Sequence, residues 1–246
     1  MKFPRLALAA LVATGLAACG QEPANDPGAP GVSEAASGSG DAAREELPVM
    51  GPERHILAFG DSLLAGYGLE DGEGYPARLE AALRAKGINA RMSDAAVSGD
   101  TTAAGLQRLA FALDSQKTKP DLAIVSLGGN DMLRGLPPAE TRANLEKILA
   151  TFRERGIKVV LLGMLAAPNL GKDYAARFNP IYPSLAQAYD AELVPFFLQP
   201  VIDKPEMMQD DHVHPTRLGI EEMVAATIDD VADALPDAKG AGQAEN

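Results

Sequence analysis

The amino-acid sequence predicts an α/β fold in which helices cover both faces of a parallel β-sheet. Two observations support this prediction. First, short apolar segments alternate along the chain with segments whose apolar residues recur at helical spacing, as in folds built from alternating strands and helices. Second, the short apolar segments are hydrophobic along most of their length rather than at every second residue, which is typical of strands buried in a parallel sheet.

Five segments are predicted to form the strands. In chain order they are residues 55–59, 88–92, 122–127, 157–162 and 192–197. The first ends at Gly60, a residue type that commonly ends such elements. Because ligands of a parallel sheet bind beyond the carboxyl ends of its strands, a site is expected in the loops that follow these segments.

Helices are expected between these strands and after the last one. In chain order they span residues 75–86, 101–113, 138–155 and 172–190, followed by a final helix opened by Pro215. Gly87 follows the first helix as its C-terminal stop, and Asp100 or Thr101 is the expected N-cap of the second. Pro180 and Pro183 are expected to interrupt the fourth.

Both ends of the chain are predicted to lie outside the folded domain, which we place at residues 54–235. Residues 1–18 are predicted to be a signal peptide, because a positively charged start precedes an apolar stretch too short to span a bilayer. Residues 19–53, which are rich in Gly, Ala, Pro and Ser, are expected to form a flexible linker. Residues 236–246 are expected to be a disordered tail.

The predicted signal peptide leads into Leu16-Ala17-Ala18-Cys19, which resembles the bacterial lipoprotein signal. The resemblance implies lipidation of Cys19, cleavage before it, and a mature protein that is lipid-anchored to a bacterial membrane in the cell envelope, facing the periplasm or the exterior. Gly20 resembles the residue found at this position in outer-membrane lipoproteins. The alternative is an ordinary secretory signal in which Cys19 is incidental.

Composition and charge exclude several classes of function. Of the 246 residues, 46% are hydrophobic and 23% are charged, a balance that fits a globular protein. The formal net charge of −12 disfavours binding to nucleic acids, whose phosphates require clustered Lys and Arg. The chain has a single cysteine, so neither an internal disulfide nor a cysteine-rich zinc site can form.

Three polar, glycine-containing loops follow the first three predicted strands. They contain Gly60-Asp61-Ser62, Ser98-Gly99-Asp100 and Gly128-Gly129-Asn130-Asp131. Each pattern alone is common in ordinary turns. Together, at successive strand ends, they bring a serine, a backbone N–H and an amide side chain to one crevice. The serine, Ser62, is the candidate nucleophile.

A serine nucleophile needs a base, and the sequence offers His55, His212 and His214. His55 begins the first strand, at the opposite edge of the sheet from Ser62, and is expected to be structural. Asp211 and His214 lie in a loop that leads into the last helix, where the carboxylate can hold one imidazole nitrogen while the other faces the serine. Two alternatives remain: a metal site built on His212, His214 and neighbouring aspartates, and a loop that is merely acidic surface.

The ordered set of motifs resembles the SGNH (GDSL) hydrolase superfamily, and most closely its bacterial thioesterase I/lysophospholipase/arylesterase branch. The similarity spans residues 57–215 through the segments GDSLLAGYGL, SGDTT, LGGNDMLRG, FNPIYPSLA, PFF and MQDDHVHP. Each of these segments alone is moderately specific, whereas the ordered set is highly specific.

The resemblance implies a three-layer α/β/α, flavodoxin-like fold with a five-stranded parallel sheet. It implies that Ser62 is the nucleophile, His214 the base and Asp211 the acid that orients it. It further implies an oxyanion hole formed by the N–H groups of Ser62 and Gly99 and the side-chain amide of Asn130. The implied enzyme is a serine esterase or thioesterase that hydrolyses short- to medium-chain acyl substrates through an acyl-enzyme, with no metal or organic cofactor.

One residue departs from the family pattern. Asp94 stands where the family often has Asn, five residues before Gly99, which bears on hydrogen bonding in that loop rather than on the chemistry. The apolar segments 164–168 and 136–138 are candidates for lining an acyl groove, with ordinary loop packing as the alternative.

Two rival functions stay open: a carbohydrate O-acetylesterase, and a non-catalytic ligand-binding lipoprotein on the same fold. We expect a monomer that binds an acyl ester or thioester and that contacts a membrane through its lipid anchor. No nucleic-acid partner is expected.

Overall fold

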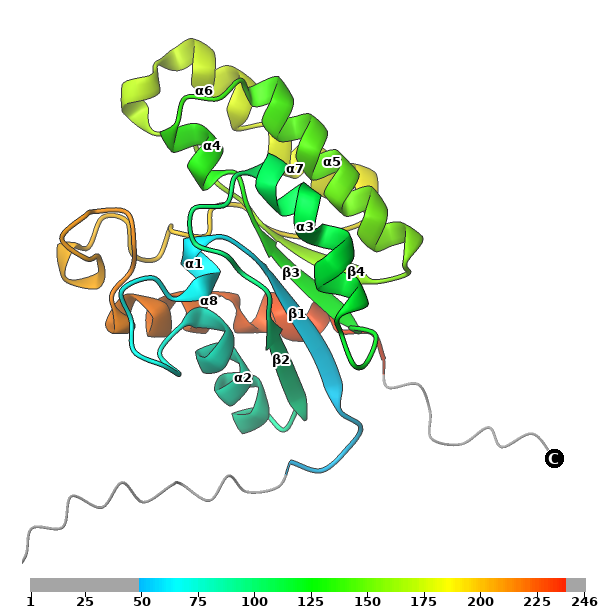
Figure 1. Cartoon of the computed structure of the whole chain (residues 1–246). Coiled ribbons are helices and arrows are strands. Elements are labelled where there is room, and N and C mark those ends of the chain that lie inside the picture. Colours follow the sequence, from blue (N-terminus) through cyan, green and yellow to red (C-terminus); the bar gives the residue numbers. More distant parts are fainter. Residues whose placement is uncertain (1–48, 238–246) are drawn as a thin grey trace, which may run out of the picture. The chain divides into compact units, whose positions relative to one another are not determined.

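Five parallel strands form one central sheet in the order β2-β1-β3-β4-β5 (Figure 1). The strands are β1 (Arg54–Gly60), β2 (Ala90–Asp94), β3 (Leu122–Ser126), β4 (Lys158–Leu162) and β5 (Glu192–Val194). This is the flavodoxin-like strand order. The predicted fold class, with its five-stranded parallel sheet, is therefore confirmed.

The computed structural model describes residues 49–237, which belong to one compact unit. The predicted signal peptide (1–18), Cys19 and most of the predicted linker (19–53) lie outside the described residues, as does most of the predicted tail (236–246).

Helices cover the sheet on both faces (Figure 1). The long helices are α2 (Tyr75–Ala85), α3 (Thr102–Asp114), α5 (Pro138–Glu154), α7 (Ile181–Tyr189) and α8 (Arg217–Ala234). Helices α2 and α8 pack against each other on one face, while α3, α5 and α7 form the layer on the other face. None of the helices within residues 49–237 has the length and apolar character needed to cross a bilayer.

The centre of the sheet is the apolar core of this domain. Every residue of β3 is buried, and β1 is buried from Ile56 onward, because helices cover both of their faces. The edge strand β2 is buried only at Ala90. Gly60 at the end of β1 pairs with Ser126 at the end of β3, so the two central strands end side by side.

Several predicted boundaries differ from the structure. The strand predicted at 88–92 is instead β2, which starts two residues later, because the N–H of Ile88 bonds to the carbonyl of Leu83 and closes helix α2. The last helix begins at Arg217 rather than at Pro215, because the hydroxyl of Thr216 accepts a hydrogen bond from the N–H of Gly219 and serves as the N-cap.

The segment expected at 172–190 forms two helices, α6 (Lys172–Phe178) and α7. The interruption predicted at Pro180 is present, because this residue lies between the two helices. Pro183 does not interrupt the helix, because it lies in the first turn of α7. Backbone N–H groups in the first turn have no acceptor within the helix, so a proline there costs no hydrogen bond. The strand expected at 192–197 is shorter, because β5 ends at Val194.

Two short helices follow β1 and β3, where the sequence predicts loops. They are α1 (Ser62–Ala65) and α4 (Gly129–Leu133). The carboxylate of Asp61 caps α1 by accepting the N–H of Leu63, and Gly128 precedes α4 with a φ of 110°. Each turn places Ser62 or Asn130 at the carboxyl edge of the sheet.

Candidate active site

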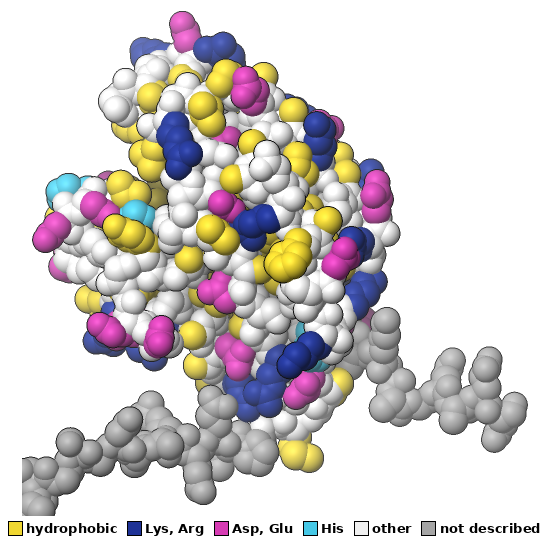
Figure 2. Space-filling model, in the orientation of Figure 1, with side chains coloured by type: hydrophobic (Ala, Val, Ile, Leu, Met, Phe, Trp, Pro, Cys, Tyr) yellow, Lys and Arg dark blue, Asp and Glu magenta, His cyan; other side chains and the backbone are white. Residues whose placement is uncertain are grey.

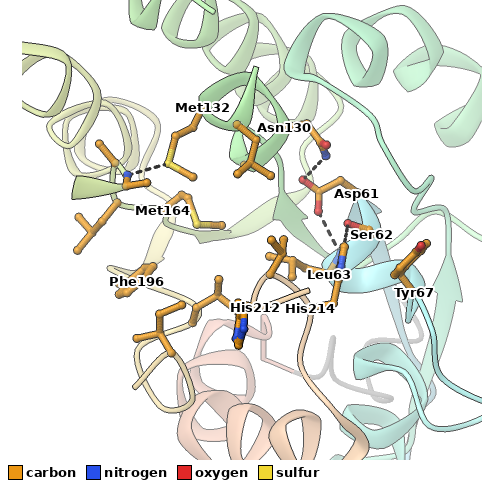
Figure 3. A pocket seen from close by; sticks show the side chains of 18 of the residues that line it. Asp61, Ser62, Leu63, Tyr67, Asn130, Met132, Met164, Phe196, His212 and His214 are labelled. Carbon is orange, nitrogen blue, oxygen red and sulfur yellow. Dashed lines mark hydrogen bonds between the residues drawn. The ribbon is translucent and has the colours of Figure 1, made fainter. Parts of the chain in front are cut away.

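The residues predicted from the sequence meet at the carboxyl edge of the sheet, where the strand order reverses between β1 and β3. In doubly wound folds this is where ligands bind. Ser62, Gly99, Asn130 and His214 line a common cavity of about 710 Å³ (Figure 3). They come from α1, the loop after β2, α4 and the loop before α8.

Ser62, His214 and Asp211 form a continuous hydrogen-bonded chain. The Oγ of Ser62 lies 2.8 Å from Nε2 of His214 (Figure 3). On the other side of the imidazole ring, Nδ1 lies 2.6 Å from Oδ2 of Asp211. A carboxylate only accepts hydrogen bonds, so Nδ1 of the neutral ring carries the hydrogen and Nε2 accepts from the serine hydroxyl.

Asp211 is held by its own loop. Its Oδ1 accepts the backbone N–H groups of Val213 at 2.9 Å and His214 at 3.0 Å. Burial acts to raise the pKa of Asp211, but the hydrogen bonds from the imidazole and from these two N–H groups outweigh it and bring the pKa down to about 2. The carboxylate therefore stays ionised beside the imidazole near neutral pH.

Two residues that the sequence reasoning did not single out support the imidazole. The ring of Tyr67 lies with its centroid 4.4 Å from that of His214. The side-chain amide of Gln209 donates to the carbonyls of Tyr67 at 2.7 Å and Pro215 at 2.9 Å. Gln209 therefore joins the loop that carries the histidine to the segment that follows Ser62. Tyr67 lies within the motif GDSLLAGYGL and Gln209 within MQDDHVHP. Membership in these motifs is the sequence signal that could have identified both residues.

The opposite wall of the cavity carries Gly99 and Asn130. Gly99 has a φ of 86°, a conformation that favours glycine, and its carbonyl accepts a hydrogen bond from the Arg134 guanidinium at 2.8 Å. The Nδ2 of Asn130 donates to Oδ2 of Asp61 at 3.4 Å (Figure 3). The three groups predicted to form an oxyanion hole therefore come from three different strand ends.

A buried polar network fixes this wall. Asp131 is 1% exposed, and its carboxylate accepts the N–H of Thr102 at 2.8 Å and the hydroxyl of the same residue at 2.5 Å. Thr141 donates to the same carboxylate at 3.3 Å, and Asn144 donates to the Thr102 hydroxyl at 3.1 Å. The network joins the start of α3, just after Gly99, to helix α4.

Asp94, which departs from the family pattern, holds the loop after β2. Its Oδ1 accepts the N–H of Ala96 at 2.8 Å. Burial raises the pKa of this carboxyl, while the Ala96 hydrogen bond and the nearby Arg108 lower it. Arg108 in turn donates to the carbonyls of Ala95 at 2.5 Å and Gly60 at 2.9 Å. The loop is thereby attached to the end of β1, directly before Asp61.

The rest of the cavity wall is largely apolar. The lining includes Met132, Leu133, Met164–Pro168, Phe196, Leu198 and Ile202. Segment 164–168, a candidate for lining an acyl groove, does line this cavity, whereas segment 136–138 is not part of the lining. Pro138 is buried at the start of α5, and the Leu136 carbonyl accepts the Tyr174 hydroxyl at 3.0 Å. That segment packs as an ordinary loop.

The remaining histidines take different positions. His55 lies at the start of β1, at the opposite end of the strand from the cavity, where its ring is 3.6 Å from Glu53. His212 lines the cavity with a positive φ of 57°. Within residues 49–237, no group of three or more His, Cys, Asp or Glu side chains is arranged to hold a metal ion. Both ring nitrogens of His214 are already engaged by Ser62 and Asp211, so the geometry favours the nucleophile–base interpretation over a metal site.

Residues 58–221 match the model of the GDSL-like lipase/acylhydrolase family. The chain belongs to this family. It is also 42% identical over 160 residues to an arylesterase of Vibrio mimicus, a match that covers 65% of this chain and 79% of the relative. It is 38% identical over 162 residues to thioesterase 1/protease 1/lysophospholipase L1 of Escherichia coli K12, covering 66% of this chain and 76% of the relative.

A solved structure extends this similarity. The crystal structure of AlinE4, described as an SGNH-hydrolase family esterase, superposes with a TM-score of 0.65 and 64% identity. The superposition covers 76% of this chain and 99% of AlinE4. As a member of the GDSL-like family with these relatives, the protein is an ester hydrolase.

Proposed function

We propose that the protein hydrolyses carboxylic esters and thioesters of apolar acyl groups through an acyl-enzyme on Ser62. The observation that carries this proposal is the hydrogen-bonded chain from Ser62 through His214 to Asp211, at 2.8 and 2.6 Å. Such an unbroken chain suits transfer of the serine proton to Nε2 while the carboxylate stabilises the imidazolium that forms.

The reaction then follows from the roles of these groups. Ser62 Oγ attacks the carbonyl carbon while His214 accepts its proton, and the imidazolium gives that proton to the leaving alcohol or thiol. Water, activated by the same imidazole, attacks the acyl-enzyme and releases the carboxylic acid. In each half-reaction the tetrahedral oxyanion is stabilised by the N–H groups of Ser62 and Gly99 and by the Asn130 amide.

The cavity supports an apolar acyl group of short to medium length as the substrate. Met132, Met164 and Phe196 form part of its inner wall. Leu133, Leu165 and Ile202 also line it and are 56%, 41% and 37% exposed, respectively. Exposed apolar side chains clustered around a cavity are characteristic of binding sites for apolar ligands.

Two measurements test this function together. A fluorophosphonate should label Ser62 of the wild type and should leave Ser62→Ala unlabelled. A series of p-nitrophenyl esters from acetate to palmitate, with an acyl-CoA and a lysophospholipid beside it, should show the highest kcat/KM at short to medium chain lengths. Turnover confined to acetate would instead indicate an O-acetylesterase. Absence of labelling and of turnover would indicate a ligand-binding protein.

We further propose that Cys19 carries lipid and anchors the enzyme to a bacterial membrane, with the domain facing the periplasm or the exterior. The support is the sequence Leu16-Ala17-Ala18-Cys19, which contains the only cysteine of the chain. Each acyl methylene buried in a bilayer contributes about 0.8 kcal/mol, so two or more chains give stable attachment.

Metabolic labelling with an alkyne fatty acid tests the anchor. Label should appear on the wild type and be absent from Cys19→Ala, which should leave the membrane fraction. A shortened chain that begins at Leu47 should remain in solution and should hydrolyse a small ester at the full-length rate. An unlabelled wild type free in the periplasm or the medium would reduce residues 1–18 to a secretory signal.

A further inference from the structure

Asp61 is a buried carboxyl group that contacts both sides of the site but has no part in proton transfer from Ser62. It is 2% exposed. Its Oδ1 accepts the N–H of Leu63 at 3.2 Å, and its Oδ2 accepts Nδ2 of Asn130 at 3.4 Å (Figure 3). One carboxyl group thus holds the turn that carries the nucleophile and the side chain that faces it across the cavity.

We propose that Asp61 is a positioning residue that fixes the orientation of the Asn130 amide, so that an N–H rather than the carbonyl oxygen faces the oxyanion. This inference rests on the proposed ester hydrolysis. An asparagine side chain is nearly symmetric in shape, and its two ends differ only in hydrogen bonding. An ionised carboxylate accepts but never donates, so it selects the amide nitrogen as its neighbour.

The selected orientation matters because the amide nitrogen has two hydrogens. One is used by Asp61, and the second remains available to the oxyanion. In the flipped orientation, the amide oxygen would face the Asp61 carboxylate and no N–H from Asn130 would reach the cavity. Since each oxyanion donor contributes through its position before the reaction begins, a side chain that flips freely would lose much of its value.

The surroundings of Asp61 make its charge sensitive to pH. Burial raises its pKa to about 7, the Leu63 and Asn130 hydrogen bonds lower it, and the nearby carboxylates of Asp100 and Asp131 raise it further. Tyr182 faces it from α7, and the Arg108 guanidinium on α3 bonds to the carbonyl of the preceding residue, Gly60. A protonated Asp61 can donate a hydrogen bond, so it no longer selects the amide nitrogen.

A double-mutant cycle tests whether Asp61 acts through Asn130. The change Asp61→Asn keeps the size of the side chain and its ability to cap α1, but allows either orientation of the Asn130 amide. With a p-nitrophenyl ester, we expect Asp61→Asn alone to lower kcat about tenfold or more with little change in KM. In an Asn130→Ala background the same change should cost less than about twofold, because the group being oriented is absent.

Asp94→Asn provides the matched control, since it makes the same carboxylate-to-amide change in a side chain that accepts a backbone N–H, that of Ala96, but has no hydrogen bond to Asn130. Its effect on kcat should be the same in the wild-type background and in the Asn130→Ala background. Equal losses from Asp61→Asn in both backgrounds would overturn the proposal, because Asp61 would then act independently of Asn130. An inactive, unlabelled wild type would instead contradict the proposed function itself.

The pH dependence gives a second readout that a purely structural role would not change. In the wild type, protonation of Asp61 adds a second proton to the acidic limb of kcat/KM, so this limb should be steeper than one proton. In Asp61→Asn the limb should fall with a slope of one proton, and in Asn130→Ala it should do so as well. A wild-type limb with a slope of one, unchanged in Asp61→Asn, would count against the proposal.

Discussion

The two walls of the cavity are built in different ways. On the base side, Asp211 holds His214 through contacts within a single loop, and both residues are partly exposed, with Asp211 39% and His214 15% accessible. Figure 2 shows histidine side chains at the surface near the loop before α8, at the left of the view, with acidic side chains close to them. The opposite wall carries Gly99 and Asn130, which we propose to bind the oxyanion, and is called the oxyanion side. There Asp131 and Thr102 are buried and lie far apart in sequence, joining α4 to α3.

Because of this difference, the two walls should contribute differently to activity and to the stability of the domain. The base side depends on local geometry, so its residues should control activity with little influence on the stability of the domain. The oxyanion side is part of the buried structure, so its residues should affect stability and activity together.

The largest effect is expected on the base side. Ser62→Ala and His214→Ala should each lower kcat by about 10⁴–10⁶, because nucleophile and base act as one unit. His212→Ala, the matched change two residues away, should be mild. Steady-state kinetics with a p-nitrophenyl ester provide the measurement. An active His214→Ala alongside an inactive His212→Ala would show that the base is assigned to the wrong residue.

A smaller loss is expected from the opposite wall. Asn130→Ala should lower kcat by about 10²–10³, the usual effect of removing one oxyanion donor, with a smaller change in KM. Comparing the loss of kcat in Asn130→Ala with that in His214→Ala shows which wall has the larger effect on turnover. Unchanged kinetics in Asn130→Ala would mean that this residue is only part of the loop.

For the free energy of unfolding the order is reversed, and substitutions on the oxyanion side should have the larger effect. Thr102→Val leaves Asp131 and Asn144 short of a partner and should lower the free energy of unfolding by about 1–3 kcal/mol. The control, Thr151→Val, removes only an exposed bond to the Lys147 carbonyl and should cost less than about 0.5 kcal/mol. Asp211→Asn should lose activity at a smaller cost in stability than Thr102→Val, because the Asp211 carboxylate is partly exposed and its interactions are screened by solvent. Urea unfolding would contradict the comparison if Thr102→Val and Thr151→Val proved equal.

The pH dependence of stability compares the walls in a further way, because Asp211 and Asp61 should contribute with opposite signs. The pKa of Asp211 is lowered to about 2 from 3.8, so its contribution is present above about pH 4 and is lost as the pH falls toward 2. The pKa of Asp61 is raised to about 7 from 3.8, so the folded state loses stability as the pH rises from about 4 to 7.

Unfolding of the wild type, Asp211→Asn and Asp61→Asn across this pH range measures both signs. The advantage of the wild type over Asp211→Asn should shrink below about pH 4. The downward trend between about pH 4 and 7 should be weaker in Asp61→Asn. Parallel curves for all three proteins would contradict both assignments.

The same contrast explains how far the sequence could be read. Asp211 and His214 are only three residues apart in one loop, so their pairing could be predicted from their spacing. The strands β1, β3 and β4 could be predicted as well, because they are apolar along most of their length. The short helices α1 and α4 could not, because their caps, Asp61 and Gly128, occur in patterns that equally suit ordinary turns.

The long-range partners were also beyond prediction. Nothing in the local sequence indicates that Asp131 meets Thr102, or that Gln209 bonds to the carbonyl of Tyr67, because these contacts exist only once the strands are ordered in the sheet. The lining of the cavity could not be fully predicted from the sequence either. Segment 164–168 lines the cavity and 136–138 does not, although both are short apolar stretches before or around a proline.

The loop 209–215 has a consequence for how such an enzyme can diverge. This loop carries His214, the proposed base, and its residues His212 and Val213 also line the cavity. Its internal bonds do not depend on the buried network around Asp131. Substitutions at these two lining positions can alter which substrates enter while the hydrophobic core and the oxyanion donors stay in place. Selectivity in this fold can therefore drift through one exposed loop without being opposed by selection for folding.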